Sequence, residues 1–346
     1  MGLFDNRITR DGKTQVPVWF MRQAGRYHAH YQNIRKDHEF MSMCKDPKLA
    51  QEITHGPLDE FNFDAAILFS DLLFPLEQMG MGLSYHSGPP TLEVALSTTE
   101  DLKSLTPKAP AREFFDFQKQ ACSLLRSSMP EHKTLLGFVG SPFTLYSYAV
   151  EGAHKGNLIS SKLGLLDGRY EGFVEILFDN LLSEMCVQAE GGADAVCLFD
   201  TACGEVSLET FKTYLLPTIK KLTSAFKKIH PEKRVIYYSK MTNLSYLREI
   251  QDDNIDVLGV DWRMNLTEAL DELGNDYHIQ GNLDPSFLFA SWENLEKQWM
   301  KVWCQVQESK VGASKWICGL GHGVLPKTPE SNVAKSVKLI HEKFIY

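Results

Sequence analysis

Short runs of apolar and β-branched residues recur along the whole chain, separated by stretches with the spacing of amphipathic helices. Continuous apolar runs, unlike alternating ones, suit strands that are buried on both faces of a parallel sheet. The pattern predicts eight such strands, at residues 16–21, 65–69, 135–139, 195–199, 235–238, 257–260, 277–279 and 316–320.

The stretches between these runs carry helix start and stop signals. Asn265, with Glu268 three residues later, predicts a helix N-terminus, and Gly274 predicts the end of that helix in the left-handed conformation. Ser207 predicts the cap of a longer helix, which Pro217 should kink because proline removes an amide donor. Two more helices are predicted by apolar stripes, namely Phe173, Leu177, Leu181 and Met185 ending at Gly191, and Val333, Val337, Ile340 and Phe344 opening at Thr328.

Strand and helix alternating eight times is the pattern of a (β/α)8 TIM barrel. We therefore expect an α/β fold in which residues 1–346 form a single barrel domain. The alternative is an open doubly wound sheet, but no G-x-G-x-x-G motif follows the first predicted strand. Residues 72–134 predict an excursion between strands two and three, with short strands of its own. Its turn-forming residues include Gly80, Gly82, Gly88, Pro89, Pro90 and Pro107.

Net charge, apolar segments and cysteine spacing argue against several classes of protein. The 346 residues include 36 Lys and Arg against 44 Asp and Glu, so 36 − 44 gives a net charge of −8. This acidity argues against nucleic-acid and anionic-membrane binding, because phosphates need a basic face. Residues 1–7 lack the apolar stretch of a secretory signal, and the apolar run at 65–69 is too short to span a bilayer. The seven cysteines form no C-x-x-C pair and no zinc spacing, so we expect a cytoplasmic protein with reduced thiols and no metal.

Polar residues follow the predicted strands, at the ends where barrels carry their chemistry. They lie at 22–27, 70–71, 141–142, 200–201, 239–240, 261–262, 281–285 and 321–323. Arg22 and Arg26 stand four residues apart around a small Ala-Gly pair. Guanidinium groups bind carboxylate or phosphate through two parallel hydrogen bonds. The pair predicts either an anionic ligand or structural salt bridges to nearby acids.

Asp71 follows an apolar run and needs a partner, because an unpaired buried charge is costly. It could pair with Arg22 or Arg26, or accept hydrogen bonds from N–H donors of a ligand. His322 lies between two glycines, which favours contact with a ligand, and the same loop could bind phosphate. Tyr148 could belong to the core or reach a polar partner at the barrel mouth.

Three other aspartates have simpler interpretations. Asp284 precedes Pro285 and predicts a helix N-cap. Asp200 and Asp261 could form a glycosidase-type carboxylate pair, but neither stands in a distinctive motif. We expect both to orient loops and arginines.

Five segments, in order along the chain, resemble those of the uroporphyrinogen decarboxylase family. Residues 17–27 resemble its first signature and residues 137–148 its second, and residues 69–71, 280–285 and 319–323 match further family segments. The resemblance spans nearly the whole chain, and the first signature is long and specific.

This resemblance implies a cofactor-free homodimeric barrel in haem and tetrapyrrole synthesis. The implied reaction removes carbon dioxide from the acetate side chains of uroporphyrinogen III and leaves the methyl groups of coproporphyrinogen III. The catalytic residues it implies are Asp71, Arg22, Arg26 and Tyr148. The substrate-binding residues it implies are Arg22, Gln23, Arg26, Arg35, Asp71, Tyr148, Thr201 and His322.

Decarboxylation leaves an electron pair that must be accepted, commonly by a cofactor. A pyrrole protonated on carbon serves as its own electron sink, and a carboxylate such as Asp71 would stabilise the resulting positive charge. Arg22 and Arg26 would clamp acetate and propionate groups. Proton donation by Arg22 is the alternative role, which an arginine pKa of about 12.5 makes difficult.

The chain departs from the family pattern at His28-Ala29-His30, at Thr201 where Ser is commoner, at 241–243 and at 317–318. Two other functions compete. A zinc- and cobamide-dependent methyltransferase of the same superfamily would need an H-x-C after strand five, where residues 238–241 read Tyr-Ser-Lys-Met. A non-catalytic tetrapyrrole binder would not need Arg22, Arg26 and Asp71 together.

Overall fold

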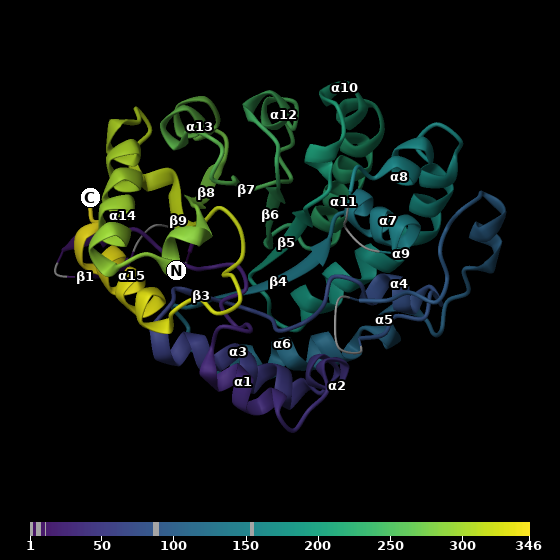
Figure 1. Ribbon diagram of the computed structural model, residues 1–346, viewed down its shortest axis with the longest axis horizontal. Helices are drawn as coiled ribbons and strands as arrows, with labels where there is room; N and C mark the ends of the chain where they lie inside the picture. Colours follow the sequence, from purple (N-terminus) through teal and green to yellow (C-terminus); the bar gives the residue numbers. More distant parts are fainter. Residues whose placement is uncertain (1–2, 5–7, 11, 86–89, 153–155) are drawn as a thin grey trace.

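The computed structural model describes residues 3–4, 8–10, 12–85, 90–152 and 156–346. Its centre is a parallel sheet of seven strands that follow one another in chain order. The strands are β3 (Ala65–Ile67), β4 (Thr134–Gly140), β5 (Ala195–Asp200), β6 (Arg234–Ser239), β7 (Val257–Gly259), β8 (His278–Leu283) and β9 (Trp316–Leu320). The sheet curls, and helices cover its outer side (Figure 1). The predicted α/β class is confirmed.

Seven of the eight predicted strands are present with small shifts of their ends, but residues 16–21 form no regular strand. Only Val18 pairs, in a parallel bridge to Cys318 of β9. On the other side, the Asp64 N–H donates to the Val18 carbonyl at 2.9 Å. The prediction of a strand here is wrong because Pro17 has no N–H to donate, and the Val18 N–H donates to the Asp64 carboxylate at 2.8 Å.

The helices precede, separate and follow the strands of the main sheet in the sequence. They are α1 (Ala29–Arg35), α2 (Phe40–Lys45), α3 (Pro47–Phe61), α4 (Phe74–Gln78), α5 (Ala111–Phe114), α6 (Asp116–Ser128), α7 (Pro142–Glu151), α8 (Ile159–Leu163), α9 (Arg169–Glu190), α10 (Leu208–Thr210), α11 (Leu216–Ile229), α12 (Leu244–Arg248), α13 (Leu266–Leu273), α14 (Trp292–Glu308) and α15 (Glu330–Lys343). A small antiparallel hairpin of β1 (Ile8–Arg10) and β2 (Lys13–Gln15), which the apolar pattern did not predict, precedes them.

Most of the predicted helix signals are confirmed. The side chains of Asn265 and Ser207 accept hydrogen bonds from the backbone of Glu268 and Thr210. Pro217 lies in the first turn of α11, directly after a π-helical turn at Phe211–Leu215.

Gly274, in contrast, ends α13 in a right-handed conformation, with φ of −70°. The left-handed prediction is wrong because the chain continues turning past Gly274. The Tyr277 N–H still donates to the Leu273 carbonyl at 2.9 Å.

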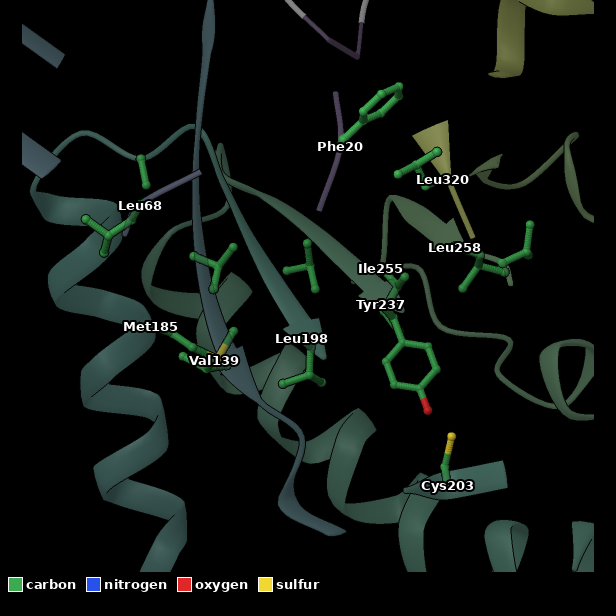
Figure 2. Close-up of a cluster of buried hydrophobic side chains, with 14 of the residues drawn as sticks. Phe20, Leu68, Val139, Met185, Leu198, Cys203, Tyr237, Ile255, Leu258 and Leu320 are labelled. Carbon is green, nitrogen blue, oxygen red and sulfur yellow. The ribbon is translucent and has the colours of Figure 1, made fainter. Parts of the chain in front are cut away.

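The core has two parts, one on each face of the sheet. The outer part packs strands against helices and includes Val139, Leu198, Tyr237, Leu258 and Leu320 (Figure 2). The inner part consists almost wholly of strand residues, such as Ala195, Cys197 and Phe199 of β5. Residues 16–21 alternate in the same way, because Val18 and Phe20 lie in the outer part and Trp19 and Met21 in the inner part.

Residues 72–133, between β3 and β4, hold α4, α5, α6 and a 3-10 turn at Glu100–Ser104. In place of the short strands predicted there, the described residues show one antiparallel bridge, between Ser84 and Thr91. Gly88 and Pro89, on which part of that prediction rested, lie outside the described residues. So do residues 1–2 and 5–7, on which the expectation about a signal segment rested. Among the described helices, none is long and apolar enough to cross a membrane.

A buried ionic cluster at the amino end of β3 joins distant parts of the chain. Asp64 accepts from the Val18 N–H, lies 2.9 Å from His341 Nε2 of α15, and lies 3.8 Å from Lys133 Nζ. Gln15 donates to the His341 carbonyl. The segment that leads to Arg22 is therefore held by contacts with the last helix and with the start of β3.

We predict that Asp64→Ala lowers the free energy of unfolding by about 3–5 kcal/mol, because it removes the acceptor of the Val18 N–H and the negative charge beside buried Lys133 and His341. Chemical denaturation followed by circular dichroism measures this loss. Asp59→Ala, at an exposed carboxylate of α3, is the matched control and should change little. Equal effects of the two variants would contradict the structural role of Asp64.

Candidate active site

The two arginines lie in the turn that follows residues 16–21. Arg22 adopts a left-handed backbone conformation with φ of 61°, which costs about 1–3 kcal/mol for a residue with a side chain. Its side chain lies on Gly323, where a Cβ would stand 2.5 Å from Arg22 Cδ. The Val324 N–H donates to the Met21 carbonyl at 2.8 Å and fixes the loop after β9 beside this turn. Gly323 therefore provides the space that Arg22 occupies.

Gln23 is buried and attaches the arginine turn to the sheet. Its Nε2 donates to the Ala65 carbonyl of β3 at 3.0 Å, and its own carbonyl accepts from the Tyr27 hydroxyl at 2.8 Å. These contacts serve the scaffold, while the Oε1 atom of Gln23 has no hydrogen-bond partner among the described residues. Its contact with a ligand stays a prediction.

The guanidinium groups of Arg22 and Arg26 are exposed, and no carboxylate of the described residues lies within ion-pair distance of either. Even so, desolvation by the surrounding protein lowers the pKa of Arg22, and the positive charge of Arg26 lowers it further. Arg22 is therefore accessible to solvent although much of its surroundings is protein. This arrangement favours the anionic-ligand interpretation over structural salt bridges.

Asp71 lies just past the end of β3 and is half-buried. Its Oδ1 accepts from the Leu73 N–H at 2.8 Å, and its Oδ2 accepts from the Tyr85 hydroxyl at 2.7 Å. Desolvation raises the pKa of Asp71, and the two hydrogen bonds and the charge of Arg22 lower it in part. The direct partners of this carboxylate are therefore neutral donors, and it is not locked onto a guanidinium group.

Tyr148 lies close enough to Arg22 and Asp71 for their charges to shift its pKa. It lies on α7, where desolvation and the nearby Asp71 charge raise its pKa while Arg22 lowers it. Thr144 lies one helical turn earlier and contacts the end of β5. The structure thus brings Arg22, Arg26, Asp71 and Tyr148, all predicted as catalytic, into one electrostatic neighbourhood.

His322 lies at the same place, in the loop after β9. Its ring stacks on that of Tyr238, with centroids 5.9 Å apart. The Tyr238 hydroxyl donates to the Gly321 carbonyl at 2.8 Å, and the Tyr238 side chain is close enough to Arg22 for each to shift the pKa of the other. Tyr238 therefore orients His322 and the loop that carries Gly323.

Thr201 follows a fully buried carboxylate, Asp200. The Asp200 side chain accepts from the hydroxyls of Ser141, Thr144 and Tyr237 at 2.9, 3.1 and 3.0 Å. Desolvation raises its pKa. The Tyr237 hydroxyl is also directed at the Cys203 thiol (Figure 2). Asp200 thus fixes the loop that presents Thr201, as predicted.

The other predictions for single residues have clear outcomes. Asp261 pairs with Arg263 at 2.6 Å and accepts from the Met241 N–H, so it orients a loop and an arginine as expected. Asp284 caps the turn at Pro285–Phe289 by accepting from the Ser286 N–H, which confirms the N-cap.

Arg35 and His28 lie farther out along the first helix. Arg35 is exposed at the end of α1. Its charge lowers the pKa of Tyr31, and the charge of Arg26 does the same. His28 is buried, with Nε2 2.7 Å from Glu60, and its ring packs on Phe61. The His28-Ala29-His30 departure thus places both of its imidazoles in the packing of α1 against α3, since His30 Nε2 lies 3.1 Å from the Glu52 carbonyl.

Comparison with known proteins identifies the family. The family described as Uroporphyrinogen decarboxylase (URO-D) matches residues 6–343. A protein named Uroporphyrinogen decarboxylase from Syntrophotalea carbinolica is 36% identical over 95% of this chain and 94% of its own length. Another of that name from Carboxydothermus hydrogenoformans is 36% identical over 96% of this chain and 94% of its own.

This chain belongs to the uroporphyrinogen decarboxylase family. The resemblance inferred from the motifs is thereby confirmed. Among solved structures, a methyltransferase from Methanosarcina mazei superposes with a TM-score of 0.75 over 97% of this chain and 95% of its own, at 16% identity. At that identity the likeness concerns the fold alone.

Two aromatic residues of this decarboxylase-family site escaped the sequence analysis. Tyr85 donates to Asp71 across 14 residues of chain, and Tyr238 lies under His322. Tyr238 ends an apolar run, which predicts a strand and gives no sign of a role in the site. Tyr85 lies in the excursion, where no periodicity marked it. No group of three His, Cys, Asp or Glu residues gathers as a metal site anywhere in the described ranges.

We predict that an arginine-specific dicarbonyl reagent modifies Arg22 at least several-fold faster than Arg169. The reagent attacks the neutral guanidine, so a lowered pKa together with exposure favours reaction. Arg169 is the internal control, because it is buried and paired with Asp167 at 2.9 Å. Peptide mass spectrometry over time gives both rates. Equal rates for Arg22 and Arg169 would contradict the exposure and the lowered pKa of Arg22.

Proposed function

We propose that this protein removes the four acetate carboxyl groups of uroporphyrinogen III as carbon dioxide, giving coproporphyrinogen III in tetrapyrrole biosynthesis. Family membership over residues 6–343 supports decarboxylation of this substrate class. The single structural observation that carries the proposal is the environment of the Asp71 carboxylate. Neutral donors hold this carboxylate beside two arginines that lack carboxylate partners among the described residues.

The chemistry follows from the macrocycle's own pyrroles. A proton adds to the ring carbon next to the one that bears the acetate, and the ring becomes a cationic iminium that is conjugated with the acetate-bearing carbon. The acetate C–CO2 bond then breaks, its electron pair neutralises the iminium, and a second proton and the loss of the ring proton leave a methyl group. Asp71 accepts hydrogen bonds from pyrrole N–H groups and stabilises the cationic stage, which lowers the barrier in a desolvated site.

Arg22 and Arg26 clamp the substrate's carboxylates and fix its orientation. Desolvation lowers the pKa of Arg22, which is the direction that proton donation requires. The clamp needs no such shift, so we assign Arg22 to clamping and keep proton donation as the second role.

Tyr148, Thr201 and His322 supply hydroxyl and imidazole groups at the carboxyl ends of the strands, and we assign them to substrate carboxylates and N–H groups. Gln23 acts mainly by holding the arginine turn on β3. Arg35, at the exposed end of α1, would meet the outermost carboxylates.

The competing functions have less support. A tetrapyrrole binder without activity would not need a desolvated carboxylate facing the macrocycle. The methyltransferase alternative has only the shared fold at 16% identity, and the loop after β6 contains no H-x-C.

We further propose that residues 1–346 form one domain, a closed (β/α)8 barrel in which residues 16–21 fill the place of the first strand. The bridge from Val18 to Cys318 on one side and the Asp64–Val18 hydrogen bond on the other support closure. The alternation of residues 18–21 between the two core parts supports it too. Residues 72–133 are then the excursion between strands two and three. A cytoplasmic location is consistent with seven free cysteines, six of them buried.

A homodimer is supported by an apolar patch around α8. Ile159, Leu163 and Leu166 are 66%, 55% and 73% exposed, which is unusual for large apolar side chains so close together. Beside them lies a hollow of about 300 Å³ that Leu165, Val206 and Tyr214 help to line. We propose that a second copy of this chain covers this patch.

We predict that Asp71→Asn folds normally and loses turnover by about 10²–10³-fold, the usual cost of removing a group that stabilises transition-state charge. Anaerobic incubation with uroporphyrinogen III, oxidation and chromatography of the porphyrins measure the loss. Asp253→Asn, at an exposed carboxylate, is the control. Near-normal turnover of Asp71→Asn would refute the electrostatic role.

We predict that Leu166→Glu raises the dimer dissociation constant at least about tenfold, because burying an unpaired charge costs well over 1.4 kcal/mol. Sedimentation velocity across a concentration series measures it. Ile229→Glu places the same charge at an apolar side chain that is 53% exposed on α11, and it should leave the dimer intact. An unchanged constant for Leu166→Glu would place the interface elsewhere.

A further inference from the structure

The contacts of Asp71 single out one residue outside the set implied by the motifs. Tyr85 lies in the excursion between β3 and β4, yet its hydroxyl donates to Asp71 Oδ2 at 2.7 Å. The Leu73 N–H occupies the other oxygen at 2.8 Å. An ionised carboxylate has about four lone-pair sites, so these two bonds leave one acceptor site on each oxygen. The remaining sites are available to pyrrole N–H donors.

The ring of Tyr85 is held from two sides. It packs on Phe40 at the start of α2, with centroids 4.7 Å apart, and Phe40 in turn packs on Phe69, two residues before Asp71. The backbone of the preceding residue, Ser84, exchanges two hydrogen bonds with Thr91 at 3.0 and 2.9 Å. Ring packing and a backbone bridge therefore hold the Tyr85 phenol beside Asp71. Its position does not depend on the hydrogen bond to Asp71.

We propose that Tyr85 is a positioning residue of this site, whose hydroxyl keeps the Asp71 carboxylate ionised and turned toward the macrocycle. This role rests on the proposed function of Asp71.

The charges around Asp71 leave it in need of such a donor. Several titratable groups, from each element packed around Asp71, shift its pKa or have their own pKa shifted by its charge. They are Arg22, Cys44, Glu77, Tyr85, Tyr148 and Glu184. Arg22 is the one cation among them, and desolvation outweighs it in setting the pKa of Asp71. Tyr85 can donate throughout the working range, because burial and the neighbouring carboxylate raise its own pKa.

The consequence is a defined pH dependence. The hydrogen bond from Tyr85 favours the ionised form of Asp71 and so lowers its pKa. Without that bond the pKa rises, and activity that needs the carboxylate is lost at the acid end of the profile and regained as the pH increases. Tyr85→Phe keeps the ring against Phe40 and removes only the donor.

The test is kcat/KM for uroporphyrinogen III against pH. For Tyr85→Phe we expect the acid limb to move upward by about one to two pH units, the equivalent of one hydrogen bond to a charged group. Tyr277→Phe is the control, because it removes a phenol that accepts from the Asp252 N–H at 3.0 Å near the amino ends of the strands. A loss by one constant factor at every pH, or no loss at all, would overturn the proposal.

A double-mutant cycle separates this proposal from the one on which it rests. In the Asp71→Asn background, Tyr85→Phe should have no further effect on single-turnover rates, because its partner is already gone. Losses that multiply would overturn a role exerted through Asp71. Full turnover by Asp71→Asn alone would instead overturn the proposed function of Asp71.

Discussion

A carboxylate that is kept away from bulk water without a direct counter-ion is the constraint on which the rest of this site depends. Asp71 is desolvated, and its bonded partners are a backbone N–H and a phenol. A guanidinium bound directly to it would cancel its field and occupy the acceptor sites that a substrate needs. The structure instead places Arg22 near enough to influence Asp71 electrostatically, and free of carboxylate partners among the described residues. The two charges thus stay separate and available to different parts of one ligand.

The scaffold serves this separation. Gln23 holds the arginine turn on β3, the same strand that leads to Asp71, so the two charges share one rigid support. Gly323 leaves room for the Arg22 stem, and Tyr238 supports the loop that carries Gly323. Asp200 organises the opposite side through three hydroxyls. A buried carboxylate whose two oxygens are both hydrogen-bonded, as those of Asp200 are, fixes loops that apolar packing alone would leave free to vary.

The sequence predicted the fold class because seven strands are continuous apolar runs, and buried parallel strands require that pattern. It failed at residues 16–21, where the apolar pattern is right but Pro17 and the Asp64 carboxylate replace the regular ladder. The contacts of Asp64 cannot be anticipated from periodicity, since they join residues up to 277 positions apart. For the site, strand-end position and motif resemblance indicated Arg22, Arg26, Asp71 and His322. Tyr85 was missed because long-range hydrogen bonds from an irregular segment have no signature in spacing.

The bridge from residues 16–21 to β9 and the contact of Asp64 with His341 have a consequence for folding during synthesis. One of the two flanking partners of the stretch that presents Arg22 is β9, about 300 residues later in the sequence. During synthesis some 300 further residues are made after that stretch before its neighbour in β9 exists. A chain that stops short of its last helix would carry every residue of the site and still lack the support that orients the first arginine.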